Sequence, residues 1–354
     1  MRRHTVDQRV KIPDFWVKES GGKVSAMMNT KNTGTRFFVV IVNYNGGAIL
    51  SNCVRSVLRE DVRAAQIIIV DNGSQDDSLA NIERDAPGTT IIRNTCNAGF
   101  ARAVNQGLAQ AQGDFFLLLN NDAQLQPGAL RAFADAFDQI PEIAIAGGQL
   151  HYADGRLQNA IAPLPTLTAE FLPRALLKWI FPLRFQGKIV AGIPTAVESV
   201  IGACLAVRRS SLPRLGLLDE DYFFFLEETE WCQRARRLGF QVYHVPAARA
   251  LHAQGQTANR FRTAARIEFH RSKLIFFKKT RTFAAYLILA ALLPIKSLIN
   301  ALSNTILCLL TACASARQRA KTLGYWHIIV WYVLGRPASW GLPGKCAQKK
   351  TKVK

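Results

Sequence analysis

The residues best placed to bind a metal ion follow a short apolar run near the middle of the chain. Residues 115–119 read FFLLL, and Asn120, Asn121 and Asp122 come directly after them. Such a run is typical of a strand buried in a parallel sheet, and ligands of open α/β sheets bind beyond the carboxyl ends of these strands. A carboxylate there can bind a hard cation, which in turn binds a diphosphate. Asp122 is therefore a candidate metal ligand, although Asn and Asp also form ordinary turns.

A second group that could do chemistry is the acidic cluster of Glu227, Glu228 and Glu230. A carboxylate can act as the general base that deprotonates a hydroxyl nucleophile. The cluster also opens a predicted helix over residues 228–238, where acidic side chains interact favourably with the positive end of the helix dipole. The pattern thus fits either a catalytic base or a helix stabilised at its first turn.

These candidates need a scaffold, and the chain around them alternates apolar runs with helical patterns. Residues 37–45, 66–71, 89–94 and 115–120 are predicted strands, and helical segments follow them. Alternation with short connections predicts βαβ units and a mostly parallel sheet. The fold class expected from the residues is therefore α/β.

Polar side chains follow the apolar runs, where the strands should end. They are Asn43, Asn45, Asp71, Asn72, Ser74, Asn97 and Asp122. In a parallel sheet these residues gather along one edge, as in a nucleotide site. Neither G-x-G-x-x-G nor G-x-x-x-x-G-K-[ST] occurs, so the common dinucleotide and P-loop binding modes are not supported. A flavodoxin-like domain with polar loops is the alternative interpretation.

Composition limits the partners. The 354 residues suit one large α/β domain with an appendage, and a net charge of +20 predicts an anionic partner: nucleic acid, a phosphorylated substrate or an acidic membrane. The mean hydropathy of +0.05 indicates a buried or membrane-facing apolar surplus.

The cysteines and the first residues of the chain indicate the compartment. Seven Cys without a C-x-x-C motif are expected to be reduced cytosolic thiols. Residues 1–20 contain no apolar signal-peptide core, so the catalytic part is expected to stay cytoplasmic.

Five segments, taken in order, resemble the successive motifs of glycosyltransferase family 2, most closely its rhamnosyltransferase-like branch. They are VNYN at 42–45, DNGS at 71–74, NAGFARAVNQG at 97–107, LLNND at 118–122 and DEDYFFFLEETEWCQRARRLGF at 219–240. The resemblance covers about residues 37–279. It implies a GT-A type nucleotide-binding fold with a mostly parallel central sheet, a nucleotide-sugar donor, a divalent metal and inversion at the anomeric carbon.

The resemblance also assigns donor-binding roles. Asp71 would bind the nucleobase, with the backbone near Val42 and Asn43 beside it. Residues 97–102 would face the ribose and the diphosphate. The complete set of expected donor-binding residues is Val42, Asn43, Asn45, Asp71, Asn72, Asn97, Gly99, Phe100, Arg102 and Asn120.

Metal and base assignments follow from the same resemblance. Asn120 and Asp122 occupy the family's D-x-D position, and Asn in the first place leaves one carboxylate to bind Mg²⁺ or Mn²⁺. His252 matches a family His that contacts the metal or the diphosphate, although a lone His is often structural. The family base falls on Glu228, where Glu in place of Asp adds a methylene, and Glu227 is the second candidate.

The C-terminal part combines basic and apolar segments. Residues 261–281 alternate basic and aromatic side chains, which fits either a nucleic-acid surface or a basic helix on an anionic membrane. Residues 283–293 are wholly apolar, and Pro294 is expected to interrupt them. Because a spanning helix needs about 20 apolar residues, a monotopic or re-entrant anchor is favoured over a clean span. The predicted domains are a disordered extension (1–35), the GT-A domain (36–280) and a helical membrane-associating region (281–354).

The sequence thus favours an inverting glycosyltransferase at the cytoplasmic face of the inner membrane, peripheral or monotopic. It would transfer a sugar, with L-rhamnose from dTDP-rhamnose as the specific expectation, to a lipid-linked or surface-polysaccharide acceptor. One alternative is another sugar, such as galactofuranose, N-acetylglucosamine or another hexose. A nucleic-acid-binding protein and a non-catalytic scaffold are alternatives of other classes. No nucleic-acid-binding motif is visible, so no nucleic-acid partner is expected.

Overall fold

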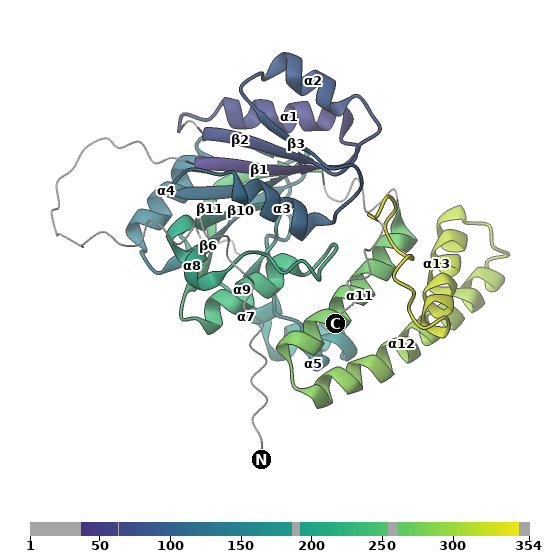
Figure 1. The fold of residues 1–354 in the computed structure, drawn as a ribbon. Helices are drawn as coiled ribbons and strands as arrows, with labels where there is room; N and C mark the ends of the chain where they lie inside the picture. The colour runs from purple at the N-terminus through teal and green to yellow at the C-terminus, as the bar shows by residue number, and fades with distance from the viewer. Residues whose placement is uncertain (1–36, 63, 186–191, 254–260, 347–354) are drawn as a thin grey trace, which may run out of the picture.

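A nine-stranded sheet forms the centre of the computed structural model, which describes residues 37–62, 64–185, 192–253 and 261–346 (Figure 1). The strand order is β3-β2-β1-β4-β10-β6-β11-β5, with β8 paired to β11. The strands are β1 (Phe37–Asn43), β2 (Ala64–Asp71), β3 (Thr90–Arg93), β4 (Phe115–Asn120), β5 (Ala123–Leu125), β6 (Ile143–His151), β8 (Thr195–Ala196), β10 (Cys204–Arg208) and β11 (Gln241–His252). The predicted extension over residues 1–35 lies outside the described residues.

The sheet is mostly parallel, as expected. Strand β1 pairs in parallel with β2 and β4, β2 with β3, and β6 with β11. Strand β10 runs antiparallel between β4 and β6, and β5 and β8 run antiparallel to β11. The parallel strands therefore end at one edge, where β4 stops at Asn120 and β1 at Asn43.

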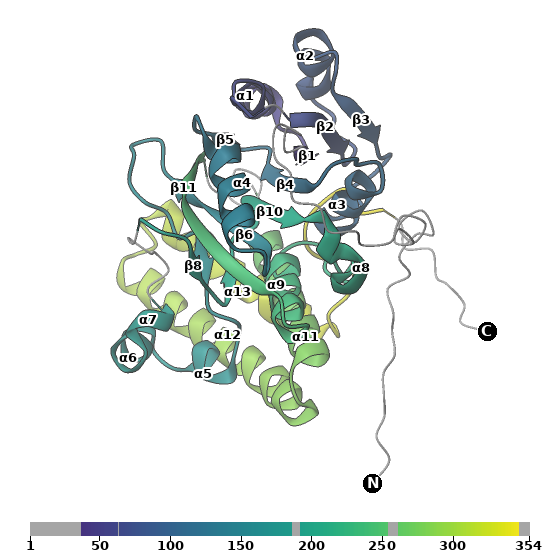
Figure 2. The same ribbon diagram turned by 90° about the vertical axis from the view of Figure 1, so that its left-hand side faces the viewer.

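Helices cover both faces of the sheet, which is why the central strands are apolar without alternation. Phe37, Val39 and Ile41 pack on one face, whereas Phe38 and Val40 pack on the other. Helices α1 (Gly47–Leu58), α2 (Ser78–Asp85) and α4 (Ala129–Gln139) belong to the first face, and α3 (Phe100–Ala109), α8 (Leu212–Leu215) and α9 (Glu227–Arg237) belong to the second (Figure 2). A 3₁₀ turn, η2 (Arg209–Ser211), precedes α8.

The segment without periodicity after β6 is packed against the rest of the molecule. It contains a small sheet of β7 (Ile161–Ala162) and β9 (Ser199–Val200), and the helices α5 (Leu167–Phe171), α6 (Arg174–Ile180) and α7 (Pro182–Phe185). Glu170 of α5 forms ion pairs with Lys273 at 2.7 Å and with Lys296 at 2.9 Å. These contacts join the insertion to the C-terminal helices.

Three C-terminal helices, α11 (Arg262–Thr280), α12 (Phe283–Leu310) and α13 (Ala316–Val333), pack around a separate apolar cluster (Figure 1). The predicted interruption at Pro294 is wrong, because this proline lies inside α12, a continuous helix of 28 residues. Among the described residues, α12 is the one helix long and apolar enough to cross a membrane by length and composition. Its outer side chains are exposed, with Phe283 at 73% and Leu310 at 80%.

Candidate active site

A cavity of about 260 Å³ opens where the parallel strands end. Strand ends supply Val42, Asn72, Asn120 and His252, and the turn after β4 supplies Asp122. The first turn of α9 supplies Glu227 and Glu228, and the segment after α13 supplies Leu342. The remaining lining residues are Tyr44, Asn97, Phe100, Asn121, Ile201, Gly202, Ala203, Phe223, Phe224 and Phe225. The fold therefore gathers nine of the predicted site residues at one cavity.

The two predicted metal ligands face each other. His252 Nε2 lies 3.3 Å from Asp122 Oδ1, and both side chains are buried. Antiparallel pairing of β11 with β5 brings them together, because His252 is in register with Ala123.

Gln158 determines how His252 presents its ring. The Gln158 amide nitrogen donates to the His252 carbonyl oxygen at 2.5 Å, so its Oε1 is left to accept from His252 Nδ1 at 3.1 Å. This network assigns the proton to Nδ1 and a lone pair to Nε2, facing the Asp122 carboxylate. A carboxylate oxygen and an imidazole nitrogen aimed at one point fit a divalent cation such as Mn²⁺. Because no group of three such ligands occurs among the described residues, oxygens of a bound substrate would complete the coordination.

Glu228 reaches the cavity from the first turn of α9. Burial raises the pKa of Glu228 above its ordinary value, and hydrogen bonds from the backbone N–H groups of Glu228 itself, Gly202 and Thr229 oppose that rise. Burial and the adjacent Glu228 charge raise the pKa of Glu227 well above its ordinary value. A carboxylate with a raised pKa is a stronger base near neutral pH. Glu230 instead pairs with Arg234 at 2.8 Å, within the helix.

The turn that delivers the two acids is strained. Phe225 and Leu226 have φ values of 75° and 67°, a region that side chains larger than glycine rarely adopt. No group in the described part of the chain forms a hydrogen bond with Glu227 Oε2. Strained backbone and an unpaired buried carboxylate oxygen are features that concentrate at functional sites.

Three predicted donor-binding residues lie behind the cavity wall. Asn43 donates to Asp71 Oδ1 at 2.9 Å, and the Asp71 carboxylate also accepts from the Ser74 backbone N–H at 2.9 Å. Asn45, with φ of 53°, accepts from the backbone N–H of Gln75 at 2.8 Å. These bonds fix the loop after β2. Direct contact of Asn43, Asn45 or Asp71 with a nucleotide stays a prediction.

The predicted diphosphate loop is built on backbone contacts. The Asn72 amide donates to the Gly99 carbonyl oxygen at 3.3 Å, and the Gly99 N–H donates to Asn97 Oδ1 at 3.1 Å. Gly99 has φ of 89°, and a Cβ there would lie 2.9 Å from the Phe223 carbonyl oxygen, so glycine is required. Arg102 does not line the cavity; its guanidinium is exposed, 4.0 Å from Glu220.

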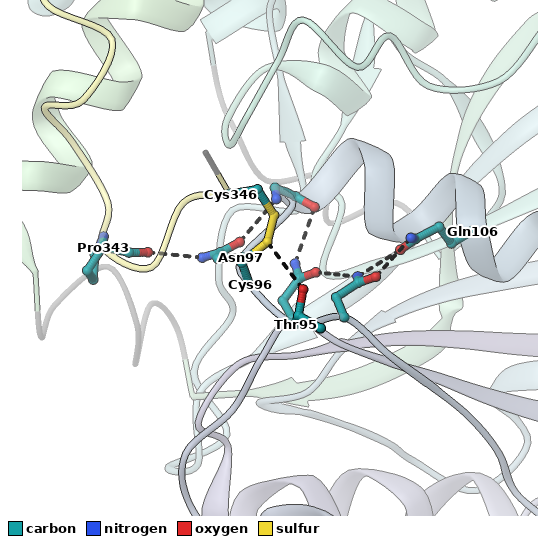
Figure 3. The surroundings of a disulfide bond; sticks show 9 residues. Thr95, Cys96, Asn97, Gln106, Pro343 and Cys346 are labelled. Carbon is teal, nitrogen blue, oxygen red and sulfur yellow. Dashed lines mark hydrogen bonds between the residues drawn. A yellow bond between two sulfur atoms is a disulfide. The ribbon is translucent and has the colours of Figure 1, made fainter. Parts of the chain in front are cut away.

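Residues 341–346, which we call the C-terminal strap, close one side of the cavity. The Asn97 N–H donates to the Gly344 carbonyl oxygen at 2.7 Å, and the Cys346 N–H donates to the Asn97 carbonyl oxygen at 3.2 Å. A disulfide joins Cys96 to Cys346, so the expectation of seven reduced thiols is wrong for these two residues (Figure 3). The remaining five cysteines are free.

Glu268 of α11 anchors the other end of the strap. This fully buried carboxylate accepts from the Leu342 N–H at 3.2 Å, pairs with Arg271 at 2.6 Å and forms an ion pair with Lys345. Lys345 also lies over the Phe223 ring, 4.7 Å from its centroid. The sequence had assigned residues 341–346 to the membrane-associating region, and no local pattern marked them as part of the site.

Comparisons with known proteins identify the family. Residues 38–216, half of the chain, match the family model described as "Glycosyl transferase family 2". An N-acetylglucosaminyl-diphospho-decaprenol L-rhamnosyltransferase of Mycobacterium tuberculosis is 26% identical over 67% of this chain and 82% of its own length. A low-salt glycan biosynthesis hexosyltransferase of Haloferax volcanii is 24% identical over 64% of this chain and 70% of its own length. A mannosyltransferase structure from Pyrobaculum calidifontis covers 90% of this chain and 91% of its own chain, with a TM-score of 0.48 and 17% identity.

Proposed function

Because the chain belongs to glycosyl transferase family 2 and has the GT-A type fold, we propose that it transfers a sugar, with inversion, from a nucleotide-sugar donor to a lipid-linked acceptor. One observation supports this most directly: Glu228 and the Asp122–His252 pair line the same cavity. A base and a diphosphate-binding centre on one cavity are what an inverting transfer needs.

The donor would bind along the carboxyl edge of β1 and β4. Asp122 and His252 are placed to hold a divalent cation, Mg²⁺ or Mn²⁺, between them and the donor diphosphate. When bound, that cation neutralises the charge that develops on the departing nucleoside diphosphate. Asn97, Phe100 and Leu342 would contact the nucleotide from the opposite wall.

Glu228 would act on the acceptor. Its carboxylate takes the proton from the acceptor hydroxyl as the hydroxyl oxygen forms a bond to the anomeric carbon. The bond from that carbon to the diphosphate oxygen breaks on the opposite face, and the nucleoside diphosphate leaves with the electron pair. The raised pKa of Glu228 supports this role, because a base works best when its pKa lies near the working pH.

For the donor sugar we propose L-rhamnose, carried by dTDP. Support comes from the Mycobacterium tuberculosis relative, which spans two thirds of this chain at 26% identity. The acceptor, by the same comparison, would carry a diphosphate lipid. Galactofuranose, N-acetylglucosamine and other hexoses are the competing donor sugars, and surface polysaccharide is the competing acceptor.

We propose a monotopic association with the cytoplasmic face of the membrane. The outer faces of α12 and α13 present large apolar side chains to solvent, among them Leu309 at 70% and Val333 at 80% exposure. Monomeric soluble proteins rarely expose contiguous apolar patches of this kind. A lipid-linked acceptor would enter the site from such a surface.

The test is a donor screen with the purified full-length protein. Each nucleotide sugar of a panel is incubated with and without Mn²⁺ and a short-chain polyprenyl diphosphate-linked N-acetylglucosamine, and released nucleoside diphosphate is measured. We expect metal-dependent release that is largest with dTDP-rhamnose and a product with inverted anomeric configuration. If no donor released nucleoside diphosphate, the enzymatic role would be contradicted. Release from a different nucleotide sugar would contradict only the choice of rhamnose as the donor sugar.

A further inference from the structure

Residues 261–346 carry most of the net positive charge of the chain. Between residues 261 and 346, Glu268 is the only acidic residue, against thirteen Lys and Arg. Glu268 is already engaged by Arg271 and Lys345. The cations of this region therefore greatly outnumber the anions available within it, and a cluster of unmatched cations attracts an anionic ligand.

Four of these cations surround a second cavity, of about 710 Å³, between the first turns of α11 and α13. Arg262 and Arg266 enter it from α11, and Arg317 and Lys321 from α13. None of the described residues that line it is acidic. Guanidinium groups bind phosphate oxygens in pairs of parallel hydrogen bonds, so three arginines and a lysine form a site suited to phosphate.

Two helix N-termini add to the positive potential. Phe261 provides no side-chain cap for the 19-residue α11, and the Ser315 side chain caps the 18-residue α13 by accepting from the Gln318 N–H at 3.3 Å. Both Phe261 and Ser315 line the cavity. First-turn N–H groups lack partners within their own helix, and together with the helix dipole they favour bound anions.

The packing of the two helices fixes the cations in place. Gly324 of α13 lies against α11, since a Cβ there would be 3.1 Å from Thr263 Oγ1 and 3.2 Å from Arg266 Nη1. The Arg266 guanidinium lies over the Tyr325 ring, 4.9 Å from its centroid. Arg266 is thus held at the cavity by the neighbouring helix before any ligand binds, which reduces the entropy lost on binding.

This cavity shares α13 with the apolar surface and α11 with the residue that anchors the strap. Helices α12 and α13 expose the apolar side chains that would contact a membrane. Along α11, Arg262 and Arg266 precede Glu268, which holds the strap against the catalytic cavity. Arg266 and Glu268 are two residues apart on α11, about 3 Å along the helix axis at about 1.5 Å of rise per residue. An amphiphile whose chain lies against the exposed apolar side chains of α13 would present its phosphates at this cavity.

We propose that this cavity binds the phosphate groups of the lipid diphosphate that carries the acceptor sugar. The proposal rests on the proposed function, because it names the part of the lipid-linked acceptor that the enzyme recognises apart from its sugar. Two adjacent phosphates complement four cations better than the single phosphate of an ordinary phospholipid headgroup does.

The experiment measures binding of farnesyl diphosphate to the full-length protein by calorimetry, with farnesol as the chain without phosphates. Two double variants, Arg266→Gln/Lys321→Gln and Arg262→Gln/Arg317→Gln, remove different halves of the cluster. Arg319→Gln is the matched control, because Arg319 lies on α13 between two of the cations but does not line the cavity. Thermal unfolding of every variant identifies any that fails to fold.

We expect each double variant to bind farnesyl diphosphate at least about tenfold more weakly, since each removes two charge-assisted contacts. Farnesol binding and the Arg319→Gln variant should be unchanged. Equal affinity for farnesyl diphosphate in wild type and both folded double variants would overturn the proposal. It would also be overturned if the double variants lost only their binding to vesicles containing phosphatidylglycerol, because the cavity would then bind a phospholipid headgroup.

This readout needs neither a donor nor turnover. Failure of sugar transfer with every nucleotide sugar would contradict the proposed function and leave the binding result intact. Normal sugar transfer to a lipid-linked acceptor, with undiminished farnesyl diphosphate affinity in the double variants, would contradict the phosphate site and leave the proposed function intact.

Discussion

Asp122 Oδ1 and His252 Nε2 lie 3.3 Å apart, and each directs a lone pair toward the space between them. Two hydrogen-bond acceptors at this distance need a cation or a proton between them. Gln158 enforces this arrangement by occupying the other ring nitrogen of His252. A hydrogen-bonding partner of this kind typically affects metal affinity by about 10–100-fold. In the proposed centre, Asp122 and His252 would be the ligands and Gln158 would orient one of them.

Replacing Asp122 tests this centre. We expect Asp122→Ala to weaken Mn²⁺-dependent binding of dTDP by at least about 100-fold, because a direct ligand should matter at least as much as a residue that orients one. Calorimetry with and without Mn²⁺ measures the effect. Asp61→Ala, which removes an exposed carboxylate paired with Arg131, is the control and should bind as the wild type does. Undiminished metal-dependent affinity in Asp122→Ala would contradict the assignment.

Glu227 links the site to stability. Its raised folded-state pKa means that the folded protein holds a proton which the unfolded chain releases. Stability is therefore lost as pH rises from the ordinary carboxyl pKa through the raised one. Glu227→Gln removes this loss, so the variant should be more stable than wild type at pH 8 and show little such difference at pH 4.5. The gain should be about 1.4 kcal/mol per unit by which the folded pKa exceeds the unfolded one.

Urea unfolding of metal-free protein at both pH values makes this measurement. Glu230→Gln is the comparison, since it loses an ion pair to Arg234 worth about 0.3–0.5 kcal/mol and should be less stable at pH 8. If Glu227→Gln is less stable than wild type at pH 8, the buried carboxylate stabilises the folded protein, and the predicted loss of stability at high pH is wrong.

At the scale of elements, the strap connects the C-terminal region to the catalytic cavity. Reduction of the Cys96–Cys346 disulfide, or Cys346→Ser, should weaken dTDP binding about tenfold, because Leu342 and the bonds to Asn97 lose a covalent anchor. Cys308→Ser replaces a free cysteine of α12 and serves as the control. Nucleotide titrations of both variants, and of wild type with and without dithiothreitol, decide the matter. Unchanged dTDP affinity in every case would mean that the disulfide stabilises the fold without contributing to nucleotide binding.

The sequence predicted the elements whose signals are local. The strand predicted over residues 115–120 and the acidic first turn of α9 appear within one residue of their expected positions. The pairing of Asp122 with His252 depends on β11 reaching β5, which no local pattern encodes. The disulfide joins residues 250 positions apart, and a spacing of that size carries no geometric information. The path of α12 through Pro294 depends on tertiary packing that outweighs the cost of proline, because Leu289 and Leu293 beside it are buried in the cluster shared with α11 and α13.

At the scale of the whole molecule, the cavity and the apolar C-terminal helices are not separable by truncation. The break between α11 and α12 falls near residue 281, but Leu342 beyond it lines the cavity and Cys346 is joined to Cys96 by a disulfide. A chain ending at residue 281 would lose the strap together with the apolar surface. The proposed membrane contact must therefore be tested by substitution.

The substitutions are Ile306→Ser and Leu310→Ser on the exposed side of α12. Each removes an apolar contact worth about 1.5–3 kcal/mol when fully buried, so the pair should shift vesicle binding by about tenfold or more. Co-sedimentation with anionic vesicles measures it, while dTDP affinity should stay unchanged. Ala301→Ser, at a buried position on the same helix, is a control for helix perturbation. Vesicle binding equal to wild type would place the membrane contact elsewhere.

Turnover of Glu228→Gln at saturating donor tests the proposed role of Glu228 as the base. Glutamine keeps the shape of the side chain and cannot take the proton, so turnover should fall about 10²–10⁴-fold while nucleotide affinity is preserved. Glu230→Gln, measured in parallel, should retain turnover, because Glu230 pairs with Arg234 within the helix. Near-normal turnover in Glu228→Gln would contradict the account, and collapse in Glu227→Gln instead would move the base to the preceding residue.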